Sequence, residues 1–365
     1  MIVIAAFILL NYILLLAVFI KGWKKIPTFE LSETLATTEP LSVVIACRNE
    51  AKNLNTLMPY LKNQTNQNFE LILINDHSVD DTWKIMNSYK TEFKNIKLLN
   101  SDRYGKKQAL HIGIVNAKND YILTTDADCL PHQRWIETIA AFKQKSQADL
   151  VVGPVVIKAK QGIFEKWQQT EFQSLIISGA GAIGSQLAFM CNGANLAFKK
   201  SVWLQSWKNL HHEINSGDDV FLLHQIKKTG GNIQFIKSPQ ALVSTSACST
   251  LQSFVKQRKR WASKSPYYRD FATIFIALSV FSISILQIWL LIKGFLELKW
   301  FMVFALIWVT KWSFDFYFLK STSAFFGCKN RFWETLSLSF IYPFYIIYTA
   351  ILGISAGIYN KLNHG

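Results

Sequence analysis

The segment DYILTTDAD, residues 120–128, decides both the fold and the place of the chemistry. Its first half is an apolar, β-branched run that predicts a buried strand, and its second half becomes polar at Asp126 and Asp128. Alternate residues at a strand end point to the same side, so the two carboxylates converge within reach of one divalent cation. An isolated Asp-x-Asp pattern is common by chance, but its position at the end of an apolar strand favours a functional site.

Similar apolar runs lie on either side of this segment, and helix-period segments separate them. The predicted strands are residues 41–46, 69–75, 95–100, 120–125 and 149–153. The predicted helices are residues 50–62, 80–89, 106–116 and 133–145. Alternation of strand and helix at this spacing predicts an α/β domain with a largely parallel sheet and helices on both faces. Ligands of such sheets bind beyond the carboxyl ends of the strands.

Charged side chains gather where the predicted strands end. Arg48 and Glu50 follow the first strand, Asp76 follows the second, and Lys106 opens the third helix. Because the carboxyl ends of parallel strands meet at one edge of a sheet, we expect these residues to share a rim with Asp126.

Two pairs of adjacent acids open helical segments. Asp80 or Asp81 is expected to act as a helix cap, because a carboxylate there accepts hydrogen bonds from the free amides of a first turn. Asp218 and Asp219 open a segment over residues 220–228, and capping explains them as well as catalysis does. The catalytic alternative is a general base, since a carboxylate crowded by other carboxylates has a raised pKa. Gly193, in a turn before a strand, would let the backbone approach a ligand closely.

The composition directs attention to the membrane. Hydrophobic residues make up 50% of the 365 residues and charged residues only 17%, against roughly 25% in an ordinary soluble protein. Four apolar runs, residues 2–20, 271–292, 300–319 and 335–359, reach the length of about 20 residues that crosses a bilayer. The first run is too long for a secretory signal and is followed by lysines, so we expect a retained anchor over residues 1–22.

The third apolar run carries Lys311 and Asp315, four residues apart. Charges at that depth are costly, so we expect them to face the protein and to pair with each other. A structural pair is the favoured interpretation, and the lining of an acceptor or product path is the alternative.

Basic residues predict the orientation. They flank the middle region on both sides, at Lys21, Lys24 and Lys25 and again at Lys256, Arg258, Lys259, Arg260, Lys264 and Arg269. Such residues concentrate on the cytoplasmic side, so the sequence predicts a multi-pass protein of the cell (inner or plasma) membrane with a cytoplasmic middle region. The five cysteines have no metal-ligand spacing and are expected to be reduced thiols.

The sequence QRKRW, residues 257–261, lies on a predicted interfacial helix that runs into the second apolar run. Basic residues and tryptophan gather at any cytoplasmic membrane boundary, which is the plainer explanation. Alternatively, Gln257, Arg260 and Trp261 share one helix face, on which the arginine can bind phosphate oxygens and the indole can stack on a sugar ring.

Together these motifs resemble the inverting nucleotide-sugar glycosyltransferases of family 2. Within that family they are similar to the membrane branch with cellulose, chitin and hyaluronan synthases and ceramide glucosyltransferases. The resemblance covers roughly residues 41–261, with motifs in the family's order at Glu50, Asp76, Gly105-Lys106, Asp126-Ala127-Asp128, Gly193-Ala194-Asn195, Asp218-Asp219 and Gln257-x-x-Arg260-Trp261. The chain departs from the family at Asn75-Asp76-His77, where two acids and a glycine are usual, and at Asp218-Asp219, where Glu-Asp is commoner.

The resemblance implies a GT-A fold, a Rossmann-like domain for nucleotide-diphospho-sugars, with one N-terminal and three C-terminal transmembrane helices. The implied division is an anchor at residues 1–22, a cytoplasmic catalytic domain at 40–248, an interfacial helix at 249–268 and three membrane helices within 269–365. The implied nucleotide-sugar ligands are Arg48, Glu50, Asp76, Lys106, Asp126, Gln257, Arg260 and Trp261. Asp128 and Asp126 would hold a divalent cation, Mg²⁺ or Mn²⁺, and the catalytic acids would be Asp219, as the base, and Asp218.

The expected reaction is inverting transfer of a sugar from a nucleotide-sugar, with UDP as the expected nucleotide, to a lipid-linked or glycan acceptor at the cytoplasmic face. A processive polysaccharide synthase is the alternative activity, although four spans can hardly enclose a polymer path. An alternative of another class is a catalytically inactive nucleotide-sugar-binding membrane protein. Membrane lipids are expected partners, whereas nucleic acid is not, because the basic residues do not alternate with aromatic ones. The oligomeric state is left open.

Overall fold

The computed structural model describes residues 1–31, 39–159, 162–214, 216–327 and 331–364, which form two compact units. The sheet unit consists of Ile26–Lys158 and Met190–Ser246. The helical unit consists of Met1–Lys25, Ala159–Phe189 and Ala247–Gly365. Part of the predicted catalytic domain, Ala159–Phe189, therefore groups with the apolar helices.

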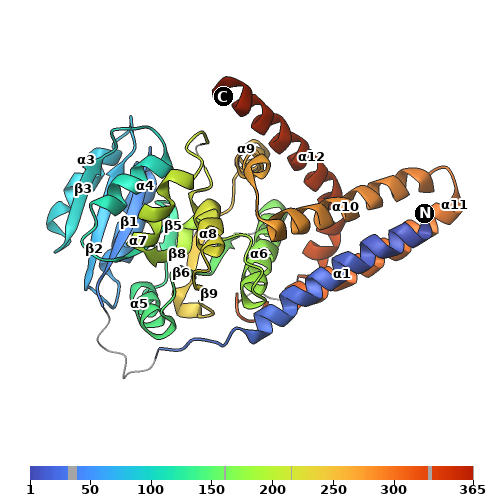
Figure 1. Ribbon diagram of the computed structural model, residues 1–365, viewed down its shortest axis with the longest axis horizontal. Helices are drawn as coiled ribbons and strands as arrows, with labels where there is room; N and C mark the ends of the chain where they lie inside the picture. The colour runs from blue at the N-terminus through green and yellow to red at the C-terminus, as the bar shows by residue number, and fades with distance from the viewer. Residues whose placement is uncertain (32–38, 160–161, 215, 328–330, 365) are drawn as a thin grey trace. The chain divides into compact units, whose positions relative to one another are not determined.

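A mixed sheet, seven-stranded over the described residues, forms the core of the sheet unit in the order β3-β2-β1-β4-β8-β6-β9 (Figure 1). Its strands are β1 (Leu41–Cys47), β2 (Phe69–Asn75), β3 (Ile96–Asn100), β4 (Tyr121–Thr124), β6 (Leu150–Val152), β8 (Leu196–Lys199) and β9 (Ile233–Phe235). The first four are parallel, as the sequence predicts, but β8 runs antiparallel to both of its neighbours. The ends of β1, β2 and β4 therefore present their following loops at one edge.

Helices accompany the strands in the expected alternation. They are α2 (Ala51–Lys62), α3 (Thr82–Ser88), α4 (Lys106–Val115), α5 (Trp135–Ser146), α7 (Lys200–Ser206) and α8 (Asp218–Lys228). β1 and β2 are apolar and buried at almost every position, as strands covered on both faces must be. Asp81 is the cap residue of α3, but its side chain makes no capping hydrogen bond. The carboxylate of the preceding Asp80 takes over the expected contact, because it accepts from the first amide of α3, at Thr82, at 3.0 Å and from the first amide of α2, at Ala51, at 3.2 Å.

A second, three-stranded sheet has the order β5-β10-β7, with β5 (Cys129–Pro131), β7 (Val155–Lys158) and β10 (Val243–Ser246). The sequence analysis did not predict this sheet, because its strands have only three or four residues each. β5 begins directly after Asp128, so the small sheet fixes the far end of the Asp126–Asp128 loop.

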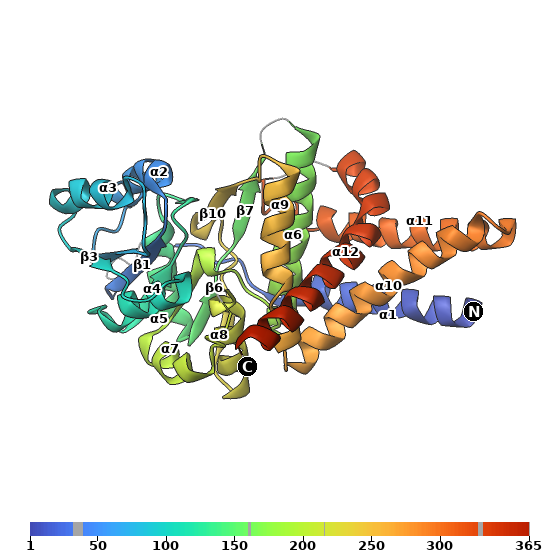
Figure 2. The same cartoon turned by 90° about the horizontal axis from the view of Figure 1, so that it is seen from above.

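The helical unit contains α1 (Ile2–Lys25), α6 (Ile163–Gly184), α9 (Leu251–Ala262), α10 (Phe271–Gly294), α11 (Leu298–Lys320) and α12 (Phe332–His364). Among the described residues, four helices are long and apolar enough to cross a membrane: α1, α10, α11 and the Phe332–Gly353 part of α12. The prediction of one N-terminal and three C-terminal apolar helices is therefore confirmed. Figures 1 and 2 show α1 alongside α10 and α11.

Close backbone contact joins α1 to α6. A Cβ added to Gly22 would lie 1.8 Å from the carbonyl oxygen of Gly181, so the two helices touch where both residues are glycine. The predicted pair in the third apolar helix also forms, with Lys311 Nζ 2.6 Å from Asp315 Oδ2. The hydroxyl of Tyr12 on α1 donates to Asp315 Oδ1 at 2.7 Å. Of the cysteines, Cys47, Cys129, Cys191 and Cys248 are free, and Cys328 lies outside the described residues.

Candidate active site

Asp126 and Asp128 lie on the loop between β4 and β5. Carboxylate oxygens of both residues and Sγ of Cys129 all lie within 4.8 Å of one another. Crowding by protein atoms raises the pKa of the Asp128 carboxyl, and the negative charge of Asp126 raises it further. A divalent cation would relieve that repulsion, so the two carboxylates fit the expected metal ion. The sequence analysis did not single out Cys129, although its place directly after Asp128 was a visible signal.

Lys106, the first residue of α4, pairs with Asp126 through Nζ and Oδ1. Burial by itself would lower the pKa of the Lys106 ammonium, but the charges of Asp126 and Asp218 outweigh this effect and raise it. The lysine is therefore a fixed positive charge beside the carboxylates. Its expected role as a nucleotide-sugar ligand stays a prediction.

Asp76 is buried and binds the backbone that precedes Lys106. The amide of Gly105 donates to both oxygens of the Asp76 carboxylate, at 3.0 and 3.2 Å. His77 Nδ1 lies 3.2 Å from the same carboxylate. Gly105 has a φ of 114°, which is accessible to glycine but strained for other residues. Asp76 thus fixes the turn that starts α4, in addition to its expected role in nucleotide binding.

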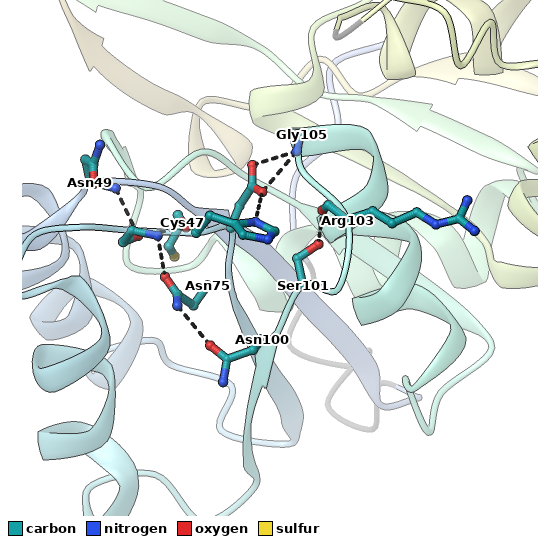
Figure 3. A network of polar contacts seen from close by, with 10 residues as sticks. Cys47, Asn49, Asn75, Asn100, Ser101, Arg103 and Gly105 are labelled. Atoms are coloured by element: carbon teal, nitrogen blue, oxygen red, sulfur yellow. Dashed lines mark hydrogen bonds and ion pairs between the residues drawn. The ribbon is translucent and has the colours of Figure 1, made fainter.

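The loops that follow β1, β2 and β3 are tied together near Asp76 (Figure 3). The amide of Asn49 donates to Ser78 Oγ at 3.1 Å, and the amide of Ser78 donates to Asn75 Oδ1 at 3.2 Å. Asn75 in turn donates to Asn100 Oδ1 at 2.9 Å. His77 has a φ of 56°, in the left-handed region that favours glycine, which is the usual residue here in the resembled family.

Arg48 and Glu50 lie on the loop between β1 and α2. The Arg48 guanidinium lies 3.9 Å from the centroid of the exposed Tyr104 ring. Glu50 accepts from Asn53 Nδ2 at 2.6 Å. Partial burial raises the pKa of Glu50, and the charges of Asp128 and Asp126 raise it further. The sheet unit therefore brings Glu50 into the electrostatic range of the candidate metal ligands.

Asp218 and Asp219 form the first turn of α8, after Gly217. Asp219 is half-buried, and its Oδ2 accepts from the amide of Gly193 at 3.2 Å. Asp218 is buried; burial raises the pKa of its carboxyl, and the opposing charge of Lys106 only moderates that shift. The more accessible Asp219 is therefore better placed to receive a proton, and the structure joins it to the predicted Gly193 turn.

Asn195 completes the Gly193 motif but has a structural role. It is fully buried, and Trp135 Nε1 donates to its Oδ1 at 2.9 Å. Its Nδ2 donates to the carbonyl oxygens of Pro154 and Ala241, each at 2.8 Å. Asn195 thus fixes the start of β8 rather than contributing a free polar group.

Gln257, Arg260 and Trp261 belong to the helical unit, where all three lie on α9. Gln257 and Trp261 are half-buried, and Arg260 is exposed. The guanidinium of Arg258 lies 4.1 Å from the centroid of the Trp261 ring, so one aromatic surface of the tryptophan already has a cationic neighbour.

Arg258, counted above among the basic residues of the membrane boundary, has a buried partner that the sequence did not predict. It is buried and forms an ion pair with the buried Glu171 of α6, with Nη2 2.5 Å from Oε2. This pair attaches α9 to α6 inside the helical unit. The position of Glu171 among the apolar residues of α6 was the signal that could have revealed this pair.

Comparison with known proteins gives a family match over residues 42–204, described as "Glycosyl transferase family 2". Glycosyltransferase GlyG of Streptococcus pneumoniae is 32% identical over 117 residues, which are 32% of this chain and 39% of that protein. The poly-beta-1,6-N-acetyl-D-glucosamine synthase of Staphylococcus aureus is 28% identical over 228 residues, which are 61% of this chain and 54% of that protein. The chain thus spans about half the length, or less, of these curated relatives.

Among solved structures, a mannosyltransferase from Pyrobaculum calidifontis in complex with GDP-Man and Mn²⁺ has a TM-score of 0.60 to this chain. The match covers 97% of both chains at 14% sequence identity. At that identity the likeness concerns the fold, and together with the family match it confirms the predicted GT-A class.

Proposed function

Because the chain carries a glycosyl transferase family 2 domain over residues 42–204, we propose that it is an inverting glycosyltransferase. It moves a sugar from a nucleotide-sugar to an acceptor at the cytoplasmic face of the membrane. The observation that carries the proposal is a cluster in the sheet unit that combines Asp126, Asp128, Lys106 and Asp219. A cation site, a fixed positive charge and an accessible carboxylate are what transfer from a sugar diphosphate requires.

The donor is held at the ends of β1, β2 and β4. Arg48, Glu50 and Asp76 bind the nucleotide, while Lys106 and Asp126 lie at the diphosphate. The relative from Staphylococcus aureus is named for a polymer of N-acetyl-D-glucosamine, which makes UDP-N-acetylglucosamine the first donor to test. In this proposal Gln257, Arg260 and Trp261 of α9 are nucleotide-sugar ligands as well.

Asp126 and Asp128 hold the divalent cation, Mg²⁺ or Mn²⁺. When bound, such a cation stabilises the negative charge that develops on a diphosphate leaving group. Lys106 adds a second positive charge on the same side, because its pKa is raised and it stays protonated.

Asp219 accepts the proton of the acceptor hydroxyl. The hydroxyl oxygen forms its bond to the anomeric carbon on the face opposite the diphosphate, whose bond to that carbon breaks, so the configuration inverts. The hydrogen bond from the Gly193 amide holds the Asp219 carboxylate in place. No covalent intermediate on the protein is required.

The acceptor is a lipid-linked molecule that receives one or a few sugars. Four apolar helices among the described residues support this choice, since a protein held in the bilayer meets lipid-linked acceptors at the membrane surface. A processive polysaccharide synthase is the second candidate, favoured by the similarity to a polysaccharide synthase and by the Gln-x-x-Arg-Trp motif.

The test is to incubate the purified protein in detergent with radiolabelled UDP-sugars, Mn²⁺ and membrane lipids, with Asp219→Asn as the inactive control. Label that extracts into organic solvent and is absent with the variant supports the proposal. A long water-soluble polymer identifies a synthase instead. Binding of UDP without release of UDP from any donor contradicts enzymatic activity and identifies an inactive sensor.

A further inference from the structure

Lys107, which follows Lys106 on α4, is a buried lysine to which the proposed mechanism gives no role. Its Nζ donates to three backbone carbonyl oxygens, those of Leu210 at 2.5 Å, His211 at 2.7 Å and Ile214 at 3.1 Å. An ammonium group has three N–H donors, so these carbonyls can engage all of them at once. Three convergent carbonyls in a short segment form a site shaped around a cation.

The segment that Lys107 holds leads directly to the acidic turn. Residues 210–214 precede Gly217 and Asp218 by a few positions, and Leu210 and Ile214 are themselves buried. The ammonium also lies 5.7 Å from the centroid of the Phe221 ring on α8. Lys107 therefore contacts both the approach to the Asp218–Asp219 turn and the helix that follows it.

The geometry at the start of α4 explains how two adjacent lysines contact two different segments. Successive residues of a helix point about 100° apart, so Lys106 reaches Asp126 while Lys107 reaches the 210–214 segment. Both directions depend on the Gly105 turn, which the Asp76 carboxylate holds.

We propose that Lys107 is a positioning residue for the general base, which fixes the 210–214 segment and thereby places Asp219 beside Gly193. This inference rests on the proposed function, because it assigns Lys107 to the same reaction. Removing the ammonium takes the lysine hydrogen bond from three backbone carbonyls, of which that of His211 keeps the amide of Ile214 as a donor, so the segment and the turn after it should loosen. The nucleotide ligands on the β1 and β2 loops should not move.

The chain offers a matched control in Lys200. Its Nζ also donates to backbone carbonyls, those of Val115 at 3.0 Å and Ala117 at 2.8 Å, but these lie at the end of α4. Lys107→Met and Lys200→Met therefore remove the same kind of contact, in the first case beside the acidic turn and in the second case elsewhere.

The first measurement is hydrogen–deuterium exchange of the full-length protein in detergent, which does not depend on catalysis. Lys107→Met should speed exchange in peptides covering residues 210–214 and 218–222 and leave residues 69–76 unchanged. Lys200→Met should speed exchange near residues 115–117 alone. Unchanged exchange at residues 218–222 in Lys107→Met overturns the inference, whatever the activity of the protein.

The second measurement separates turnover from binding. Misplacing a catalytic group by about 1 Å can cost roughly 10²-fold in rate, so kcat of Lys107→Met should fall by about that factor. Its affinity for UDP should stay near that of the wild type, and Lys200→Met should keep both values. An equal loss of kcat and UDP affinity in Lys107→Met contradicts positioning and shows general loss of structure.

If Lys107→Met does not fold, Lys107→Gln takes its place, because the amide keeps two N–H donors. It should show intermediate exchange at residues 218–222, and exchange identical to the wild type overturns the inference. The two proposals can fail separately. If the variants show the expected exchange but the wild-type protein transfers no sugar, the proposed function is refuted, while the conclusion that Lys107 holds the 210–214 segment remains.

Discussion

The sheet unit and the helical unit arrange their charges in opposite ways. In the sheet unit, carboxylates crowd together: Asp128, Glu50 and Asp218 each have a raised pKa, caused first by the loss of water around the carboxyl group and then in part by neighbouring acids. In the helical unit, opposite charges are matched in pairs, Lys311 with Asp315 and Arg258 with Glu171.

This difference indicates that the crowded carboxylates serve to bind a cation, whereas the matched pairs serve to hold helices together. Crowded carboxylates repel one another, and the repulsion is relieved when a cation binds. Matched pairs leave no such excess, and they connect helices instead: α9 to α6 through Arg258, and α1 to α11 through the Tyr12 hydroxyl on Asp315. The comparison predicts that substitutions of the crowded acids in the sheet unit lower the rate of sugar transfer. Substitutions in the ion pairs of the helical unit should instead lower the stability of the protein.

The largest effect is expected at Asp128. Asp128→Asn removes one of the two carboxylates that fit the cation and should abolish transfer. Because the Asp128 carboxyl is crowded and repelled by Asp126, the variant should fold and insert as well as the wild type. Sugar transfer and thermal unfolding in detergent check the two expectations. Full activity of the variant in the presence of a chelator would show that the cation site is misassigned.

The next effect separates the two acids of α8. Asp219→Asn should keep near-normal UDP affinity but lose transfer by about 10²-fold or more, since general base catalysis is typically worth 10²- to 10⁴-fold. Asp218→Asn should be less severe, because Asp218 is buried and only Asp219 is accessible. Rate and UDP binding are measured on both variants. The reverse order of activities would assign the base to Asp218.

The same contrast shows how far the sequence could predict the molecule. Strong signals were sufficient for β1, β2 and β4, because burial dictates the composition of these strands. They were also sufficient for the four apolar helices, because a bilayer requires about 20 apolar residues in a row. The Asp126–Asp128 cluster followed from its place at a strand end.

Other features depend on contacts between distant segments, which the sequence does not display. The antiparallel β8 and the three-stranded sheet are formed by short strands whose pairing partners lie far away along the chain. Lys107 sits next to a predicted ligand, yet its partners lie 103 to 107 residues later. In the sequence, Arg258 is one of several basic residues at the membrane boundary. Its partner Glu171 lies 87 residues earlier, so the sequence does not reveal the pair.

A smaller effect is expected from pH. Because the pKa values of Asp128 and Glu50 are raised, these groups take up protons at a higher pH than ordinary carboxyls when the solution is acidified. Protons then compete with the cation, so Mn²⁺ affinity should fall on acidification, by about tenfold for each pH unit below the raised pKa of a required ligand. Electron paramagnetic resonance titration of Mn²⁺ at stepwise lower pH, over the range in which the protein stays folded, measures this. An affinity that begins to fall only at the pH at which ordinary carboxyls take up protons would contradict the crowding of the site.

The smallest effect on activity is expected when the Lys311–Asp315 pair is reversed. Lys311→Asp alone places two carboxylates beside Tyr12, and breaking a buried pair costs about 3–5 kcal/mol, so the folded fraction and activity should both fall. The double variant Lys311→Asp, Asp315→Lys restores the pair in the opposite sense. The Tyr12 hydroxyl can accept from an ammonium as readily as it donates to a carboxylate, so its contact survives.

Recovery of both thermal stability and transfer in the double variant supports a purely structural pair. Recovery of stability without transfer would place these charges on the path of an acceptor or product, and would end the separation between a chemical sheet unit and a structural helical unit.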